Sequence, residues 1–154
     1  MKRKILLVAL FIATIMMTNR ADAQVRFNVN VNIGSQPVWG PVGYDHAEYY
    51  YLPDIEAYYY VPRRQFIYFS GNRWVFSYSL PPRYSNYDLY SGYKVVINEP
   101  RPYLHFDRDR RDYARYRGYR NQPIIRNSND SRYYGIKGHP KYNQGRGKGH
   151  GRGH

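Results

Sequence analysis

Asp54 and Glu56 are the two side chains whose type and spacing come closest to a catalytic arrangement. On a strand, residues two apart share one face, and adjacent carboxylates there can act as acid and base or bind Ca²⁺. A polar turn between the flanking tyrosine-rich segments accounts for the same residues, and catalysis would also need a pocket and a positioned partner. We therefore predict a turn here and no catalytic residue.

The histidines are the next candidates, as metal ligands. Residues 45–48 read Asp-His-Ala-Glu, but no further ligand stands at a recognisable spacing and no His-Glu-x-x-His occurs. His139, His150 and His154 lie in a glycine-rich stretch, where imidazoles can bind Zn²⁺ or Cu²⁺ weakly but no preformed geometry holds them. We predict a polar loop, a flexible polar end, no metal site and no cofactor.

The chain contains no sequence motif typical of nucleophilic catalysis or of phosphate binding. It contains no Gly-x-Ser-x-Gly elbow and no Gly-x-x-x-x-Gly-Lys-Ser/Thr loop. It also contains no cysteine, which excludes thiolate zinc sites, cysteine nucleophiles and disulfides. The sequence predicts a protein without enzymatic activity; an enzyme acting on envelope glycans or phosphates is the less favoured alternative.

Tyrosine is the most distinctive residue type, with 20 copies. Tyr-Tyr-Tyr-Leu-Pro at 49–53 recurs as Tyr-Tyr-Tyr-Val-Pro at 58–62, and neighbours on a strand point to opposite faces. One face can pack a core while the other displays rings that stack on sugars or bases or anchor interfaces. Packing of a small core alone is the simpler interpretation. The candidate binding residues are Tyr49, Tyr50, Tyr51, Tyr58, Tyr59, Tyr60 and Trp74.

Charge divides the chain after residue 100. Residues 24–100 carry six Lys or Arg and six Asp or Glu, whereas residues 101–154 carry fourteen Lys or Arg and four Asp. This basic tail, with its Arg-Gly pairs and interleaved tyrosines, resembles Arg/Gly-rich nucleic-acid-binding tails, but export would remove their usual target, and other polyanions are then the expected contact. Apolar residues are sparse in it, so we predict a mostly disordered tail that either contacts anionic material or aids solubility. Its candidate binding residues are Arg146, Lys148 and Arg152.

Short strands must position these side chains. Residues 25–33 alternate apolar and polar side chains, residues 65–77 flank a Gly-Asn turn with aromatic and β-branched residues, and residues 93–98 suit a further strand. Each tyrosine triplet should be an edge strand or end at its proline, since proline cannot donate to a ladder. The predicted class is mainly β: a small antiparallel meander or sandwich-like sheet, followed by the disordered basic C-terminal tail.

The first 23 residues have the pattern of a cleavable secretory signal peptide. Three basic residues at 2–4 precede an apolar run at 5–17, and Ala-Asp-Ala at 21–23 supplies a cleavage site after Ala23. The run is shorter than the about 20 residues of a membrane-spanning helix, so a mature chain without a transmembrane segment is expected rather than one with an uncleaved anchor. The expected organisation is a signal peptide at 1–23, a tyrosine-rich β domain at 24–100 and a basic tail at 101–154.

Several short motifs occur together between residues 49 and 98. They are Tyr-Tyr-Tyr-Leu-Pro-Asp-Ile-Glu at 49–56, Arg-Gln-Phe-Ile-Tyr at 64–68, Gly-Asn-Arg-Trp at 71–74, Leu-Pro-Pro-Arg-Tyr at 80–84, Tyr-Asp-Leu-Tyr at 87–90 and Gly-Tyr-Lys-Val-Val at 92–96. In this combination the chain resembles a group of small, uncharacterised exported proteins from Bacteroidota-type bacteria. The resemblance implies a bacterial envelope or secreted location, periplasmic or extracellular, and transfers no activity and no functional residue to this chain.

These patterns predict a non-enzymatic exported protein of the cell envelope that binds anionic or glycan material through its cationic tail and aromatic surface. The expected partners are anionic envelope polymers or lipids; cytoplasmic nucleic acid is not expected, because export removes the chain from it. The alternative is a structural or assembly component, in which exposed edges of the tyrosine-rich strands pair with another copy or with a partner.

Overall fold

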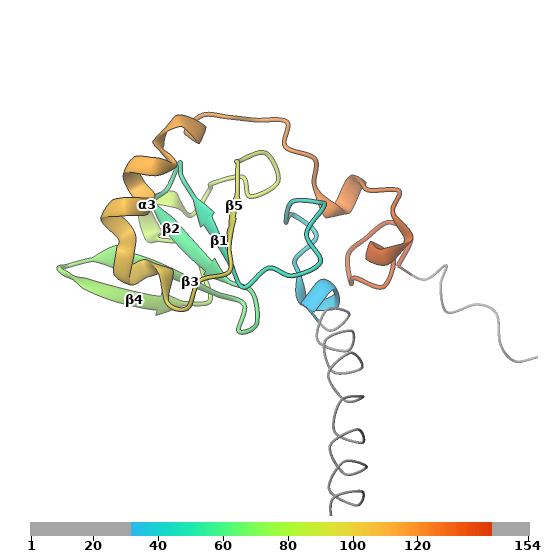
Figure 1. The fold of residues 1–154 in the computed structure, drawn as a ribbon, viewed down its shortest axis with the longest axis horizontal. Helices are drawn as coiled ribbons and strands as arrows, with labels where there is room; N and C mark the ends of the chain where they lie inside the picture. Colours follow the sequence, from blue (N-terminus) through green and yellow to red (C-terminus); the bar gives the residue numbers. More distant parts are fainter. Residues whose placement is uncertain (1–31, 143–154) are drawn as a thin grey trace, which may run out of the picture. The chain divides into compact units, whose positions relative to one another are not determined.

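The computed structural model describes residues 32–142, so the predicted signal peptide and the candidate residues Arg146, Lys148 and Arg152 lie outside the described range. Within it, antiparallel strands form one five-stranded sheet in the order β4-β3-β2-β1-β5 (Figure 1). The strands are β1 (Tyr49–Leu52), β2 (Ala57–Tyr60), β3 (Gln65–Ser70), β4 (Arg73–Ser77) and β5 (Val95–Ile97). The predicted mainly β class with a small antiparallel sheet is confirmed.

Short helical elements precede and follow the strands along the chain. Residues 32–35 form a helical turn before β1. The elements after β4 are η1 (Pro82–Tyr84), η2 (Pro102–His105), α3 (Phe106–Asp112), η3 (Ala114–Tyr116), η4 (Ile125–Asn127) and η5 (Ser131–Tyr133). Between residues 32 and 142, none of the helices has the length and apolar character needed to cross a membrane.

The strand predicted for residues 25–33 is wrong for its described residues, because Asn32 and Ile33 belong to the helical turn. Both side chains are buried, whereas strict alternation would have exposed the asparagine. The Asn32 side chain bonds both backbone groups of Ala47, accepting from its N–H at 2.7 Å and donating to its carbonyl at 3.1 Å. This contact with a distant residue satisfies a buried amide, so tertiary packing overrides the local pattern.

The β1–β2 hairpin pairs the two tyrosine triplets residue for residue. Strand β1 ends at Leu52 and β2 at Tyr60, so each strand ends before its proline, as predicted. Both are inner strands, because β5 pairs with β1 and β3 pairs with β2. The hypothesis that tyrosine-rich strands offer free edges to another copy is therefore wrong; the edges of the sheet belong to β4 and β5.

The hairpin predicted at residues 65–77 is formed by β3 and β4. Gly71 and Asn72 make its two-residue turn with φ of 57° and 62°. Two successive residues at positive φ are the requirement of a type I′ turn, whose twist matches the flanking strands. A Gly-Asn pair meets this requirement with little strain, so the local sequence is sufficient to place the turn.

Both faces of the sheet are buried. On the first face, Tyr50 and Tyr59 pack edge-on against Trp39, with the Tyr59 and Trp39 ring centroids 4.7 Å apart, and residues between 80 and 89 add to this cluster. On the second face, Tyr51 and Tyr58 pack beneath the segment from η2 to Tyr113. Alternate tyrosines of one hairpin thus pack into two separate clusters, one on each face of the sheet. The sequence pattern of the hairpin does not by itself show whether one face or both faces of the sheet are covered.

Residues 101–142 are ordered, so the prediction of a mostly disordered tail from residue 101 is wrong for this part (Figure 1). The segment from η2 to Tyr113 packs on the sheet. The apolar residues are few, but several of them pack in the core: Phe106 and Tyr113 join the cluster on the second face. Ile125, Tyr133 and Ile136 are also buried. The prediction of disorder used the average composition of the segment, in which a few apolar residues count for little. The stability of the segment depends instead on how deeply each of these residues is buried.

The second half of this segment pairs with the chain before β1. The amide of Val42 donates to Pro123 at 3.1 Å, that of Ile125 to Gly40 at 2.9 Å, and Pro41 and Ile124 form an isolated antiparallel bridge. Gly40 is required here, because a Cβ at this position would lie 2.7 Å from the Tyr50 hydroxyl. These bonds anchor residues 123–125 beside residues 40–42.

Candidate functional site

A groove of about 550 Å³ lies between the β3–β4 hairpin and the η2–α3 segment. Its walls combine aromatic rings with exposed basic and acidic side chains. The lining residues are Phe69, Trp74, Tyr103, Leu104, His105, Phe106, Asp107, Arg108 and Arg110. We refer to this hollow as the aromatic groove.

Trp74 on β4 is the centre of the aromatic wall. Its ring centroid lies 5.3 Å from that of Phe69, which faces it across the hairpin, and 5.5 Å from those of Tyr103 and Phe106. The ring planes are steeply inclined to one another, which is the favoured geometry of aromatic pairs. The wall is therefore held in place before any ligand arrives.

Two apolar side chains of the groove remain open to solvent. Phe69 is 45% exposed and Leu104 is 58% exposed. They face the groove from opposite sides, one from β3 and one from η2. Exposed apolar side chains gathered around a hollow mark an interaction site more often than isolated ones do.

A buried carboxylate attaches α3 to the sheet beside the groove. Asp109 is fully buried; its Oδ2 accepts a hydrogen bond from the Tyr58 hydroxyl at 2.8 Å, and its Oδ1 accepts from Nε of Arg108 at 3.0 Å. Burial, and then the hydrogen bond to Asp109, raise the pKa of Tyr58 far above its usual value, so the phenol stays protonated and donates. This pair fixes the position of the helix that supplies the charged wall of the groove.

The charged wall contains two arginines of α3, beside the exposed carboxylate of Asp107. Nη2 of Arg108 lies 2.9 Å from Oε2 of Glu99, and the Arg110 guanidinium lies over the Phe106 ring, 5.8 Å from its centroid. Arg110 approaches Asp107 only to 3.9 Å, and its side chain is about half exposed. Arg110 is thus the groove cation least committed to a carboxylate of this chain, and it is available to an anion of a ligand.

Most of the predicted aromatic binding residues are core residues. Tyr50, Tyr51 and Tyr58 are fully buried, and Tyr49 and Tyr59 are nearly so. These five cannot form an exposed platform, and the interpretation that they pack the core is the correct one for them.

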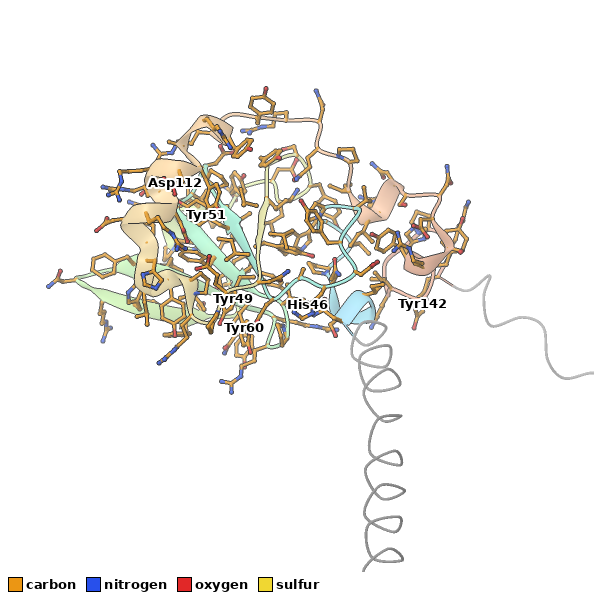
Figure 2. All side chains as sticks on the ribbon, viewed as in Figure 1. His46, Tyr49, Tyr51, Tyr60, Asp112 and Tyr142 are labelled. Carbon is orange, nitrogen blue, oxygen red and sulfur yellow. The ribbon has the colours of Figure 1, made fainter. Side chains whose placement is uncertain are left out.

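Tyr60 is only partly buried, and its ring stacks on that of Tyr49 at a centroid distance of 4.7 Å (Figure 2). Trp74 is the predicted residue that reaches the aromatic groove. Sequence reasoning missed Leu104, Phe106 and Arg110, because no periodic pattern connects η2 and α3 to a hairpin about 30 residues earlier. The cross-strand position of Phe69 opposite Trp74 was readable from the hairpin register.

Asp54 does not stand in a pocket with a catalytic partner. Its Oδ1 accepts from the amide of Gly118 at 2.7 Å, and its Oδ2 accepts from Nη1 of Arg120 at 2.8 Å and from the Tyr87 hydroxyl at 2.9 Å. The carboxylate is therefore saturated by donors of this chain. The β1–β2 turn that holds Asp54 is the predicted polar turn, and it attaches the segment around Gly118.

Glu56 completes the same attachment by accepting a hydrogen bond from Arg117. Arginines of the basic segment are thus partly neutralised by carboxylates of the sheet, which accounts for the order of residues 117–120. Surface ion pairs of this kind are individually weak, but here they are combined with a backbone hydrogen bond to Gly118 and with packed rings.

The metal-capable side chains are dispersed as well. Asp45 pairs with Arg132, and His46 is exposed on the loop before β1. His139 is buried, its Nε2 lies 3.1 Å from the Ser128 carbonyl and its Nδ1 accepts from the amide of Lys141, so the flexible end predicted around it is wrong at this residue. Among residues 32–142, no group of three His, Asp or Glu side chains is arranged to hold a metal ion.

The aromatic groove thus has three features that suit a ligand: a preformed aromatic wall, open apolar edges and a half-exposed arginine. Comparison of the chain with protein-family models, with curated proteins and with solved structures found no match, so the site is interpreted from its own geometry.

Proposed function

We propose that this protein is an exported, non-enzymatic protein of the cell envelope that binds an anionic glycan in the aromatic groove. The observation that carries the proposal is the open aromatic wall of Phe69 and Trp74 facing the half-exposed guanidinium of Arg110. Aromatic rings stack on the apolar faces of sugar rings, and a guanidinium pairs with carboxylate or phosphate groups. A glycan that carries such groups satisfies both requirements at once.

The proposed location rests on the sequence. The basic, apolar and small-residue pattern of residues 1–23 and the resemblance of residues 49–98 to exported proteins both favour export. The absence of cysteine is compatible with any redox compartment, because the fold is held together by aromatic clusters on both faces of the sheet.

The last basic residues add to the proposal. Arg146, Lys148 and Arg152 follow the described residues, and we propose that they contribute unspecific attraction to envelope polyanions or lipids. Within residues 32–142 the arginines contribute less, since Arg108, Arg117, Arg120 and Arg132 already pair with carboxylates of the chain. Binding that depends on this attraction should weaken steeply as salt is added.

Titration calorimetry with polygalacturonate, a carboxylate-bearing glycan, tests the groove. We expect Phe69→Ser to weaken binding about tenfold, because one stacked ring contributes about 1–3 kcal/mol. Arg110→Gln should weaken it about threefold and reduce its salt dependence. Neither substitution removes a buried group, so circular dichroism should show an unchanged fold.

Matched controls are present in the chain. Tyr78→Ser removes an aromatic ring that is 78% exposed and does not line the groove, and Arg111→Gln removes the neighbouring cation of α3, also outside the lining. Both controls should bind like the unaltered protein. Equal losses in Arg110→Gln and Arg111→Gln would show that net charge, not the groove, drives binding.

The contribution of the end of the chain needs a separate truncation after Tyr142. Removing residues 101–154 instead would strip Phe106 and Tyr113 from the second face of the sheet and unfold the protein. Truncation at 142 should reduce the salt dependence of binding to anionic vesicles while leaving the Phe69-dependent binding intact. If the truncated protein lost the Phe69-dependent binding of polygalacturonate together with the binding to anionic vesicles, a binding role for the groove would be contradicted.

A second candidate function, assembly, is favoured by the exposed edge strand β4. It is five residues long, contains no proline and carries the exposed Phe76. Such an edge can pair with the same strand of a second copy. Light scattering should then report a dimer that Phe76→Lys dissociates, whereas a monomer at micromolar concentration would exclude this candidate.

A further inference from the structure

A second hollow, of about 370 Å³, lies where the loop before β1 meets the segment after η3. It shares no lining residue with the aromatic groove. Its lining residues are Pro41, Val42, Tyr44, Tyr93, Tyr119, Arg120, Asn121, Gln122 and Pro123. We refer to it as the tyrosine pocket, because Tyr44, Tyr93 and Tyr119 form its aromatic part.

Two rings of the pocket, Tyr93 and Tyr119, belong to an aromatic cluster with Tyr116, which lies outside the lining. The rings of Tyr93 and Tyr116 are nearly parallel, with an interplanar angle of 7° and centroids 4.5 Å apart. Tyr119 stands edge-on to both of them, at 6.0 Å from Tyr93 and 6.3 Å from Tyr116. Tyr119 is nevertheless 59% exposed, so this ring is held in position and still open to a ligand.

The rest of the pocket is held by hydrogen bonds between segments that are distant in sequence. Val42 donates to the Pro123 carbonyl at 3.1 Å. The Gln122 side chain bonds both backbone groups of Lys94, accepting from its N–H at 2.9 Å and donating to its carbonyl at 3.0 Å. Asn121 turns the chain at a φ of 66°. A pocket fixed in this way loses little conformational freedom when a ligand binds.

The charged side chain of the pocket lining, Arg120, is paired with a carboxylate that lies outside the lining. Nη1 of Arg120 lies 2.8 Å from Oδ2 of Asp54 and 2.9 Å from the Tyr119 carbonyl, so this guanidinium is already paired. The remaining polar groups of the lining are phenols and amides. Burial raises the pKa of Tyr93, which keeps that phenol neutral. A site with neutral hydrogen-bonding groups and a held aromatic ring favours an uncharged, hydroxyl-rich ring over an anion.

We propose that the tyrosine pocket binds a neutral pyranose unit. The apolar face of the sugar stacks on Tyr119, and its hydroxyl groups exchange hydrogen bonds with the Tyr44 phenol and the Asn121 amide. The volume lies within the range of small-molecule sites and suits one or two sugar rings. This inference does not rest on the function proposed for the aromatic groove, because it uses other residues and requires no ligand charge.

Saturation-transfer difference NMR with the uncharged sugars methyl β-glucoside, methyl α-mannoside and N-acetylglucosamine tests the proposal on the full mature chain. At least one of them should receive saturation from the protein at millimolar concentration. Tyr119→Ala should weaken that binding about tenfold, the effect of losing one stacked ring. Tyr44→Ala should weaken it less, and added salt should leave it unchanged.

Three controls make the outcome decisive. Tyr78→Ala removes an exposed tyrosine outside the pocket and should bind the sugar normally. Phe69→Ser should also bind it normally, while Tyr119→Ala should retain polygalacturonate binding, which separates the two sites. The proposal is overturned if no neutral sugar receives saturation, or if Tyr119→Ala, with unchanged circular dichroism, binds the sugar as well as the unaltered protein.

Discussion

The two faces of the sheet receive alternate tyrosines of the same hairpin, yet they satisfy the phenol hydroxyls in different ways. On the first face, the Tyr50 hydroxyl donates to Oε1 of Gln36 at 2.9 Å, a neutral partner supplied by the chain before β1. On the second face, the Tyr58 hydroxyl donates to the buried carboxylate of Asp109, supplied by α3. The Tyr51 hydroxyl, also on the second face, is buried with no hydrogen-bond partner among the described residues.

This difference shows how a repeated sequence acquires non-equivalent roles. The two triplets are identical in composition, but their hydroxyls are buried beside a neutral amide, a carboxylate or apolar atoms. Each hydroxyl therefore makes a different contribution to the free energy of unfolding. The second face is therefore attached to α3 by a buried carboxylate as well as by the rings of Phe106 and Tyr113, whereas the hydroxyl of Tyr50 on the first face meets only a neutral amide.

The largest effect is expected from removing that charged group. Asp109→Leu leaves the Tyr58 hydroxyl buried without an acceptor and removes one partner of Arg108, so it should lower the free energy of unfolding by about 3 kcal/mol. Urea denaturation measures the change. Asp107→Leu, on the same helix but exposed, is the control and should change stability by less than about 0.5 kcal/mol. Equal effects would mean that α3 is not anchored through Asp109.

The next effect concerns Lys94, which immediately precedes β5 and whose Nζ is buried without a hydrogen-bond partner in the described range. Burial lowers its pKa to about 8 from 10.5, and attraction by Asp88 offsets this only in part. At pH 7 the folded protein must keep a charged ammonium group buried at Lys94, which costs free energy. Lys94→Met replaces this group by an apolar one and should raise the free energy of unfolding by about 2 kcal/mol.

The same group predicts a pH dependence. Between about pH 8 and 10.5 the unfolded chain holds the Lys94 proton while the folded chain has released it, so stability should rise with pH in this window. Above pH 10 the buried tyrosines act in the opposite direction, since burial raises the pKa of Tyr49 to about 12. Stability measured against pH should thus pass through a maximum near pH 10, and Lys94→Met should remove the rising limb. A rising limb that persists in this variant would assign it to another group.

A smaller effect compares the two hydrogen-bonded tyrosines directly. Tyr58→Phe deprives a buried carboxylate of a donor and should lower the free energy of unfolding by about 2 kcal/mol, whereas Tyr50→Phe deprives a neutral amide and should lower it by about 1 kcal/mol. Thermal and urea unfolding of both variants measure the difference. The reverse order would contradict the contrast between a charged and a neutral face.

The smallest effect has the opposite sign. Tyr51→Phe removes a hydroxyl that has no partner, while its ring contacts with Tyr58 and Tyr113 remain, so stability should stay unchanged or increase by up to about 1 kcal/mol. A loss comparable to that of Tyr58→Phe would reveal a partner for this hydroxyl, such as a bound water.

Local sequence was sufficient for the hairpins. The Gly71-Asn72 turn and its aromatic flanks specify β3 and β4, and the prolines after each tyrosine triplet limit β1 and β2. It was insufficient for residues 101–142, because a few apolar side chains such as Phe106 and Ile125 stabilise a segment whose average composition is that of a disordered chain. For the same reason, only Trp74 of the aromatic groove was expected.

The order of residues along the chain determined the β3–β4 hairpin, the ends of β1 and β2 and the alternation of tyrosines between two faces, since these depend on backbone sterics and on a period of two. The tertiary structure decided the hydrogen-bond partner of each buried tyrosine hydroxyl. Because α3 and the segment before β1 fold onto opposite faces, one hydroxyl bonds a carboxylate, one bonds an amide, and one has no partner among the described residues. Burial and hydrogen bonding are properties of neighbours in space, so no local pattern encodes them.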